Sequence, residues 1–251
     1  MDEDLLIVTT ALICAGLVAG FIDAIAGGGG LITIPVFSFI LGVGPHAIGT
    51  NKIAGTVAAL VALVVYARGK HFDWRRSLGF TLWVALGSWT GSRVAVHIPV
   101  DYFKYFLALT CPLVLYVVWR KDFWAKEAQP GERPHYGALV ASGLACGFYD
   151  GVWGTGGGTF MFLSLLFFVK LPIFTALAAA KFANTCSAGT ALLGYSLGGF
   201  VHWREGLTLS AGIGAGAFLG ARHATQKNAQ VIRPVLALVA VILLSKLLFQ
   251  F

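Results

Sequence analysis

The sequence has few charged residues, and this scarcity decides the class of protein. Only 12% of its 251 residues are Asp, Glu, Lys or Arg, whereas 57% are hydrophobic. A soluble domain is roughly one-quarter charged. The mean hydropathy of +0.80 agrees with this shortage of polar surface. The composition excludes a soluble enzyme, a nucleic-acid-binding protein and a disordered chain, and it predicts a protein that lies in a lipid bilayer.

The sequence also lacks the motifs of metal, redox and nucleotide chemistry. Its four cysteines lie in apolar segments, at spacings that fit neither a zinc site nor a redox pair. It contains no HExxH motif and no P-loop, and its glycine runs do not follow a strand in a βαβ unit. We therefore expect no metal and no cofactor. The net charge of +7 is dispersed between apolar runs, so it does not predict a nucleic-acid partner.

The chain contains an internal repeat. Gly20-Phe21-Ile22-Asp23 recurs as Gly147-Phe148-Tyr149-Asp150, and each copy leads into a run of glycines. Two residues are then inserted in the second copy, after which further identities keep one register. These are Lys52 and Lys181, Tyr66 and Tyr195, Gly69 and Gly198, Trp74 and Trp203, Gly91 and Gly220, and Arg93 and Arg222. We interpret the chain as two homologous membrane repeats, residues 1–125 and 136–251, joined by a cytoplasmic linker, residues 126–135.

Each half contains five apolar segments. They are Leu5–Ala26, Leu31–Leu41, Ala47–Ala67, Leu78–Val96 and Tyr102–Trp119, then Gly137–Trp153, Thr159–Val169, Ile173–Leu197, Leu207–Ala221 and Val235–Phe249. A helix needs about 20 residues to cross the hydrocarbon core, so the second segment of each half is too short. We predict an all-α polytopic membrane protein, in which each half is a broken or re-entrant helical hairpin followed by three transmembrane helices.

The number of spans predicts that the two halves have opposite orientations in the membrane. A hairpin returns to its own side, so three further spans leave the second half upside down. With the N-terminus outside, most Lys and Arg residues fall in the inner loops, as the positive-inside rule requires. Inverted repeats with interrupted helices are typical of secondary transporters.

The two glycine runs are the first candidates for a binding site. Irregular backbone at membrane depth persists only where it is buried in protein or lines a watery cavity. Amide groups at the start of the helix after each run would bind an anion. Glycines also permit close helix packing, which is the role we assign to Gly16/Gly20, Gly87/Gly91 and Gly212/Gly216/Gly220. The predicted substrate-binding residues here are Gly27, Gly28, Gly29, Gly30, Gly154, Thr155, Gly156 and Gly157.

Four ionisable residues lie inside apolar segments: Asp23, Asp150, Lys52 and Lys181. Such residues are costly in a bilayer and indicate function. One interpretation is a set of structural ion pairs or lysines that reach the interface. In the other, the lysines add positive charge to an anion site and Asp23 and Asp150 carry a proton. Polar neighbours suited to oxyanion oxygens complete the predicted substrate site: Thr50, Asn51, Asn184 and Thr185.

Together these motifs resemble the sulfite exporter TauE/SafE family. The resemblance rests on the Gly-Phe-x-Asp pattern that ends in several glycines, on Thr50-Asn51-Lys52, and on the degenerate second copy. It spans nearly the whole chain. It implies a multi-pass carrier of the bacterial inner membrane for sulfite, sulfonates or other organosulfur anions. Thr155 interrupts the second glycine run, so we expect the two halves to bind different groups.

The function that we predict is secondary transport of a small anion by alternating access, coupled to protons and without enzymatic activity. A passive anion channel is the alternative, because the same glycine breaks could line a pore. An intramembrane serine hydrolase is a further alternative, since Gly194–Gly198 matches G-x-S-x-G around Ser196 with His202 nearby. Its serine corresponds to Ala67 in the first half, so it belongs to no repeated feature. A homo-oligomeric state stays open.

Overall fold

The elements of this computed structural model are helices. It describes residues 3–68, 74–99, 102, 136–227 and 234–235, and among these it contains eight α-helices and no strand. The helices of the first half are α1 (Glu3–Ala26), α2 (Gly30–Leu41), α3 (Pro45–Arg68) and α4 (Trp74–Ala95). Those of the second half are α7 (Tyr136–Val152), α8 (Gly157–Phe167), α9 (Ile173–Leu197) and α10 (Trp203–Lys227). The predicted all-α class is confirmed.

The first two helices of each half form the predicted broken hairpin. α1 ends at Ala26 and α2 begins at Gly30, while α7 ends at Val152 and α8 begins at Gly157. The second helix is short in both halves, with 12 residues in α2 and 11 in α8. The linker, residues 126–135, and the fifth apolar segments lie outside the described residues, apart from Tyr102 and Val235.

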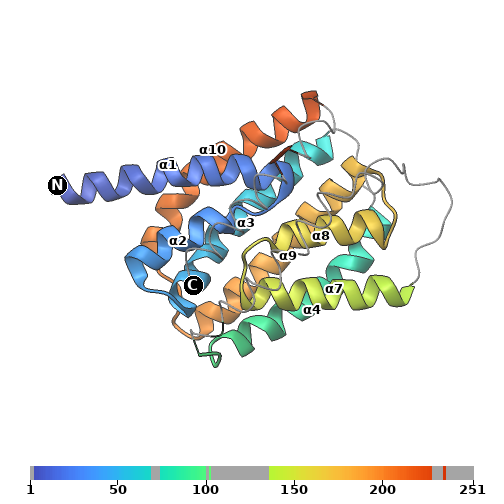
Figure 1. Ribbon diagram of the computed structural model, residues 1–251, viewed down its shortest axis with the longest axis horizontal. Helices are drawn as coiled ribbons and strands as arrows, with labels where there is room; N and C mark the ends of the chain where they lie inside the picture. Colours follow the sequence, from blue (N-terminus) through green and yellow to red (C-terminus); the bar gives the residue numbers. More distant parts are fainter. Residues whose placement is uncertain (1–2, 69–73, 100–101, 103–135, 228–233, 236–251) are drawn as a thin grey trace.

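The long helices pair across the two halves. α1 runs beside α10, and α7 runs beside α4 (Figure 1). Glycines make these close contacts possible: a Cβ at Gly20 would overlap the carbonyl oxygen of Ile213, and one at Gly147 would overlap that of Val84. The predicted packing role is confirmed for Gly16, Gly20, Gly87, Gly91, Gly212, Gly216 and Gly220, since a Cβ at each would overlap backbone of the facing helix.

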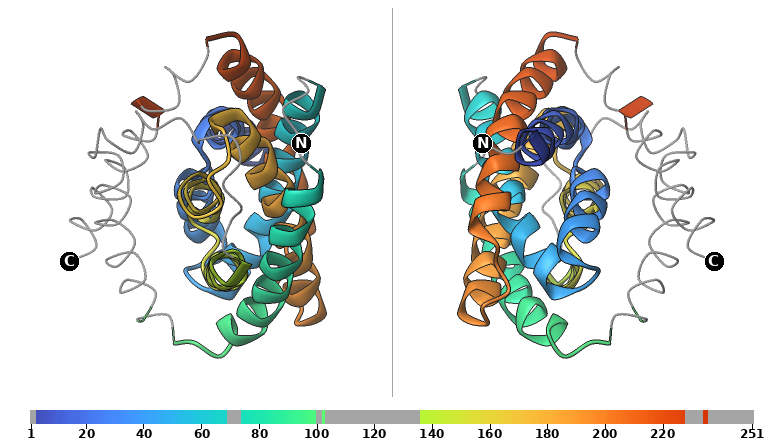
Figure 2. Two further views of the ribbon diagram at one scale, coloured as in Figure 1. Left: turned by 90° about the vertical axis from the view of Figure 1, so that its right-hand side faces the viewer. Right: turned by 90° about the vertical axis from the view of Figure 1, so that its left-hand side faces the viewer.

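The central helices α3 and α9 pack against each other and carry much of the buried surface. Each contacts a helix of the other half as well, α3 with α10 and α9 with α4. Figure 2 shows α2 and α8 on the same side of these long helices. The contacts are therefore reciprocal: the third helix of each half packs against the fourth helix of the other half. The opposite orientation of the halves in a membrane stays a prediction.

Two helices of the described part are long and apolar enough to cross a bilayer by themselves, Leu6–Ala26 and Pro45–Arg68. Two more, Gly30–Leu41 and Gly157–Phe167, are apolar but shorter. The short pair matches the prediction of hairpin helices that cannot span the hydrocarbon core alone. α4, α9 and α10 have 22, 25 and 25 residues, so they have the required length.

Candidate functional site: a polar cavity between two helix breaks

The glycines of the two breaks turn the chain through left-handed backbone conformations. In the first break Gly27 and Gly28 have φ values of 78° and 91°. In the second break these are Gly154 and Gly156, with 71° and 76°. Such values are easily reached only by glycine. They end one helix and start the next within three or four residues, which is how the sequence builds a hairpin with no room for a longer loop.

The two breaks lie against each other. A Cβ placed on Gly27 would come within 2.5 Å of the Thr159 amide nitrogen. One on Gly30 would come within 2.7 Å of the Gly154 carbonyl oxygen. The absence of side chains therefore permits backbone to approach backbone. The two glycine runs therefore meet at the contact between the halves.

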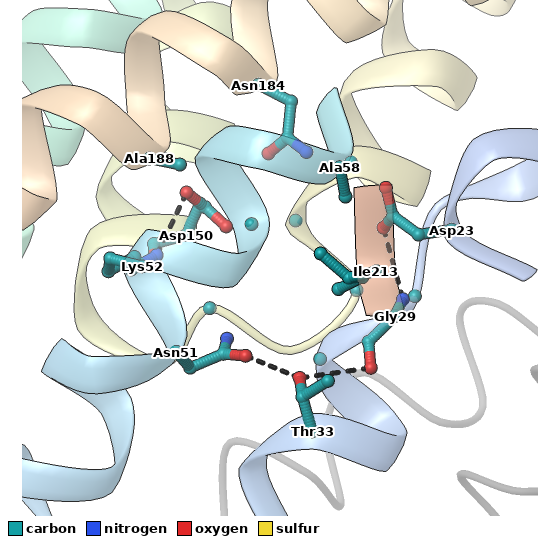
Figure 3. Close-up of a pocket in the computed structure, with 17 residues that line it drawn as sticks. Asp23, Gly29, Thr33, Asn51, Lys52, Ala58, Asp150, Asn184, Ala188 and Ile213 are labelled. Atoms are coloured by element: carbon teal, nitrogen blue, oxygen red, sulfur yellow. Dashed lines mark hydrogen bonds and ion pairs between the residues drawn. The ribbon is translucent and has the colours of Figure 1, made fainter. Parts of the chain in front are cut away.

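A small cavity lies where the breaks meet. The centre of a water molecule can move within about 20 Å³ of this cavity, which is room for one or two waters. Figure 3 shows its labelled wall residues, contributed by both halves. The wall consists of Asp23, Gly28, Gly29, Gly30, Thr33, Asn51, Lys52, Gly55, Ala58, Asp150, Gly154, Gly156, Gly157, Gly158, Asn184, Ala188 and Ile213. It combines backbone amides, carboxamides and ionised groups with a few apolar side chains.

The four ionisable residues form two ion pairs, each between the halves. Lys52 Nζ lies 3.1 Å from Asp150 Oδ2, and Lys181 Nζ lies 2.8 Å from Asp23 Oδ2. Each ammonium also donates to the backbone carbonyl of its partner aspartate. All four residues are between 2% and 7% exposed. The charges balance within each pair, so this burial does not leave a lone charge in a medium that would penalise it.

The two pairs have different further partners. Asp150 Oδ2 accepts a hydrogen bond of 2.6 Å from the Ser187 hydroxyl. Asp23 Oδ1 instead accepts one of 3.1 Å from the backbone amide of Gly29, at the start of α2. Hence the carboxylate of Asp23 holds the N-terminal end of α2, whereas that of Asp150 is held by a side chain of α9.

Two asparagine amides face the cavity. The Thr33 hydroxyl donates to Asn51 Oδ1, which leaves the Asn51 amide nitrogen beside Gly30 and Gly154. Asn184 is 6% exposed and forms no side-chain hydrogen bond within the described part of the chain. Its amide nitrogen lies 3.2 Å from the position that a Cβ of Gly158 would take. Both amides can therefore donate to an oxygen atom in the cavity.

The structure separates the sequence-predicted residues into two groups. Gly28, Gly29, Gly30, Asn51, Lys52, Gly154, Gly156, Gly157, Asn184, Asp23 and Asp150 line the cavity. The predicted residues outside its wall are Gly27, Thr50, Thr155, Lys181 and Thr185. Thr50 Oγ1 accepts from the His202 amide, and Thr185 Oγ1 donates to the Lys181 carbonyl of its own helix. Lys181 is paired with a wall residue, Asp23.

Sequence reasoning missed several wall residues. Thr33, Gly55, Ala58, Gly158, Ala188 and Ile213 also line the cavity. Thr33 had a signal, since it is a hydroxyl residue one helical turn after the first glycine run. Gly158 belongs to the second run and was left out of the predicted site. Ile213 comes from α10, and nothing in its sequence context distinguishes it from other apolar residues.

The serine hydrolase hypothesis finds no support in the geometry around Ser196. Its hydroxyl is buried and has no hydrogen-bond partner among the residues that the structure describes. The nearby histidine is engaged elsewhere: His202 Nε2 lies 3.1 Å from His46 Nδ1. A nucleophilic serine would need a base within hydrogen-bond reach.

Comparison with known proteins agrees with the membrane architecture. The sequence profile described as Sulfite exporter TauE/SafE matches residues 12–247. Probable membrane transporter protein ORF9 of a Sinorhizobium species is 35% identical over 94% of this chain and 91% of its own length. A probable membrane transporter protein of Haemophilus influenzae is also 35% identical, over 95% and 94%. No solved structure matches the chain.

A further relative is the probable membrane transporter protein YfcA of Escherichia coli K12, 32% identical over 95% of this chain and 89% of its own. These relatives match nearly end to end, so the similarity includes both halves and both helix breaks. The chain belongs to the sulfite exporter TauE/SafE family and is a membrane transporter, not an enzyme.

Proposed function

We propose that the protein is a proton-coupled secondary transporter of a small oxyanion, with sulfite and simple sulfonates as the substrate class. The observation that carries this proposal is the cavity between the two breaks, lined by backbone amides, Asn51, Asn184 and the Lys52–Asp150 pair. Sulfite is chosen because the family is described as a sulfite exporter. The donors present suit oxyanion oxygens, since amides and an ammonium group donate hydrogen bonds.

The size of the cavity favours a carrier over a channel. Room for one or two waters is too little for sulfite, which has four non-hydrogen atoms. The helices that form the wall must separate for an anion to enter, and a carrier that exposes its site alternately to each side performs this movement. Because both halves contribute to the wall, motion of one half against the other would open it.

The ion pairs offer a route for proton coupling. A proton on Asp150 would neutralise the carboxylate and leave Lys52 with an unbalanced positive charge at the cavity wall. An anion in the cavity would restore the balance. Proton and anion binding would then each strengthen the other by the same factor, as linkage between two sites requires. A proton on Asp23, which also lines the cavity, would leave Lys181 unbalanced just outside the wall.

Uptake by proteoliposomes tests the proposal. Purified protein is reconstituted, and entry of radiolabelled sulfite is followed with an inward proton gradient, no gradient and protein-free vesicles. We expect uptake that saturates with sulfite concentration and accumulates sulfite only with the gradient. Large currents that do not saturate would establish a passive channel instead. No uptake of sulfite or sulfonates under any condition would reject this substrate class.

The aspartates are tested by Asp150→Asn and Asp23→Asn in the same vesicles. An amide cannot take up the transported proton but leaves the lysine charge in place. We expect exchange of sulfite across the membrane to persist while accumulation driven by the proton gradient is lost. Gradient-driven accumulation at the wild-type level in both variants would remove the aspartates from proton coupling.

A further inference from the structure

The two helix breaks differ in how their following helices begin, and this difference indicates where an anion would bind. In the first break, Asp23 Oδ1 accepts the Gly29 amide at the start of α2. A carboxylate thus already satisfies part of the positive end of this helix. In the second break the aspartate at the matching position, Asp150, is bonded by Ser187 and Lys52. Among the described residues, no side chain forms with the first amides of α8 the hydrogen bond that Asp23 forms with Gly29.

A single sequence difference accounts for the change in geometry. Thr155 stands where the first break has Gly28, whose φ is 91°. A β-branched residue is strongly disfavoured there, so the second break makes its second left-handed turn one residue later. Gly156 has φ 76°, whereas its counterpart Gly29 has φ −53°. The backbone therefore enters α8 and α2 through different turns.

The first turns also differ in what covers them. α8 begins with Gly157 and Gly158, whereas α2 begins with Gly30 and Leu31, and Leu31 is a buried core residue. The first turn of α8 therefore presents glycines in place of a large side chain. The Asp150 carboxylate packs against it, since a Cβ at Gly157 would overlap Asp150 Oδ1. Gly156, Gly157 and Gly158 all line the cavity, while Leu31 does not.

Asn184 supplies an independent indication of a ligand at the same place. It is 6% exposed, lines the cavity, and its side chain has no hydrogen-bond partner among the described residues. Its amide lies beside Gly158. A buried carboxamide without a partner is costly unless something else satisfies it. Its counterpart in the repeat register is Gly55, so the first half has no carboxamide at this position and presents Asn51 from a different one.

We propose that the two breaks do not share the anion equally: a single oxyanion is held at the N-terminus of α8, by the amides of Gly156–Gly158 and the carboxamide of Asn184. Asn51 and Lys52 complete the cradle from the first half, because their donors reach the cavity beside Gly154. The N-terminus of α2 is occupied by Asp23 and serves the structure. This inference rests on the proposed function and assigns its anion to one of two homologous places.

Anion binding by the purified full-length protein in detergent tests the assignment, with sulfite and methanesulfonate as probes and calorimetry as the readout. Asn184→Ala should weaken binding about tenfold or more, the value of one hydrogen bond to a charged group. Asn184→Asp keeps the shape but adds a negative charge, and it should abolish binding. Thr190→Ala is the matched control, because this hydroxyl of α9 bonds to backbone carbonyls, two of its own helix and that of Ala85 in α4.

The comparison of the breaks is tested at the second residue of each short helix. Gly158→Ala places a methyl group beside the Asn184 amide and should weaken binding of both probes by a factor similar to that of Asn184→Ala. Leu31→Ala should leave the dissociation constant unchanged, although it lowers thermal stability by removing a buried side chain. Thermal unfolding without anion shows that each variant is folded.

The outcomes separate this inference from the proposed function. Wild-type affinity in Asn184→Ala and Gly158→Ala would overturn the assignment to α8, while transport by the wild-type protein would still stand. Equal weakening in Leu31→Ala and Gly158→Ala would also overturn it, because both breaks would then hold the anion. No binding and no transport of either probe by the wild-type protein would remove both proposals together.

Discussion

The first and second helix breaks come from one repeated pattern, yet they reach their turns by different residues. The first uses the left-handed conformations of Gly27 and Gly28, and the second those of Gly154 and Gly156. The shift follows from Thr155 at the position that corresponds to Gly28. It changes which helix start is bonded to an aspartate. Two homologous helix starts thus both lie against an aspartate, but only that of α2 forms an amide–carboxylate hydrogen bond among the described residues.

Away from the breaks the two halves are much more alike. Tyr66 donates from α3 to the Ala24 carbonyl, and Tyr195 donates from α9 to that of Gly151. Both tyrosines are fully buried. Each therefore ties the last turn before a break to a central helix. This similarity provides the baseline against which the differences at the breaks are measured.

The largest expected effect is loss of an ion pair in either half. Lys52→Ala and Lys181→Ala each leave a buried carboxylate without its cation, so each should lower the free energy of unfolding by about 3–5 kcal/mol. Thermal unfolding in detergent measures this, with Arg204→Ala, which removes an exposed cation at the start of α10, as the control. Stability equal to wild type in both lysine variants would contradict the buried pairs.

Gly20→Ala and Gly147→Ala test the equivalence of the halves. A Cβ at either position would overlap a carbonyl oxygen of the facing helix, so both should lose about 1–3 kcal/mol of stability through overpacking. Gly189→Ala, in α9, is the control, since a Cβ there would meet no atom within 4 Å. Thermal unfolding of the three variants is compared. A loss in only one of the first two would show that the helix pairs α1–α10 and α7–α4 are not equivalent.

Exchange of residues between the breaks sharpens the comparison. Gly28→Thr places a β-branched residue at φ 91° and should cost about 1–3 kcal/mol through backbone strain. Thr155→Gly should cost about 1 kcal/mol or less, the entropic penalty of glycine, because the Thr155 hydroxyl has no partner in the described part of the chain. Chemical or thermal unfolding gives both values. Equal losses would mean that the shifted turn is not set by Thr155.

The smallest expected effect concerns a contact that the repeat does not duplicate. His46 and His202 share a hydrogen bond between the halves, but Ile173 stands at the position that corresponds to His46. His46→Ala should therefore lower stability by about 0.5–1.5 kcal/mol, the worth of one neutral hydrogen bond, and leave sulfite uptake unchanged. A larger loss, or a change in uptake, would give this pair a role beyond stability.

Much of the fold could be predicted from the sequence because its signals are local or repeated. The apolar segments matched the observed helices, and Ile173–Leu197 has the same bounds in both. The duplicated glycine runs located the breaks. The segments beyond Val96 in the first half and Ala221 in the second fall largely outside the described residues, so their predicted spans stay predictions.

The site was harder to predict because its details depend on the meeting of distant helices. Sequence spacing placed Lys52 and Asp23 in the membrane. It did not show that each lysine pairs with the aspartate of the other half, because this pairing depends on how the two halves pack. Thr50 and Thr185 have the right chemistry, yet their hydroxyls are used by the backbone. Ile213 enters the cavity from α10, and a single apolar residue carries no signal of such a position.

The most direct test of the account is to locate a bound anion. Selenite has the shape and charge of sulfite and an anomalous X-ray signal, so crystals of the full chain grown with selenite would show where it binds. The account predicts one selenium peak in the cavity, within hydrogen-bond distance of a Gly156–Gly158 amide and of Asn184. A peak at the start of α2, or peaks only outside the space between the two breaks, would contradict it.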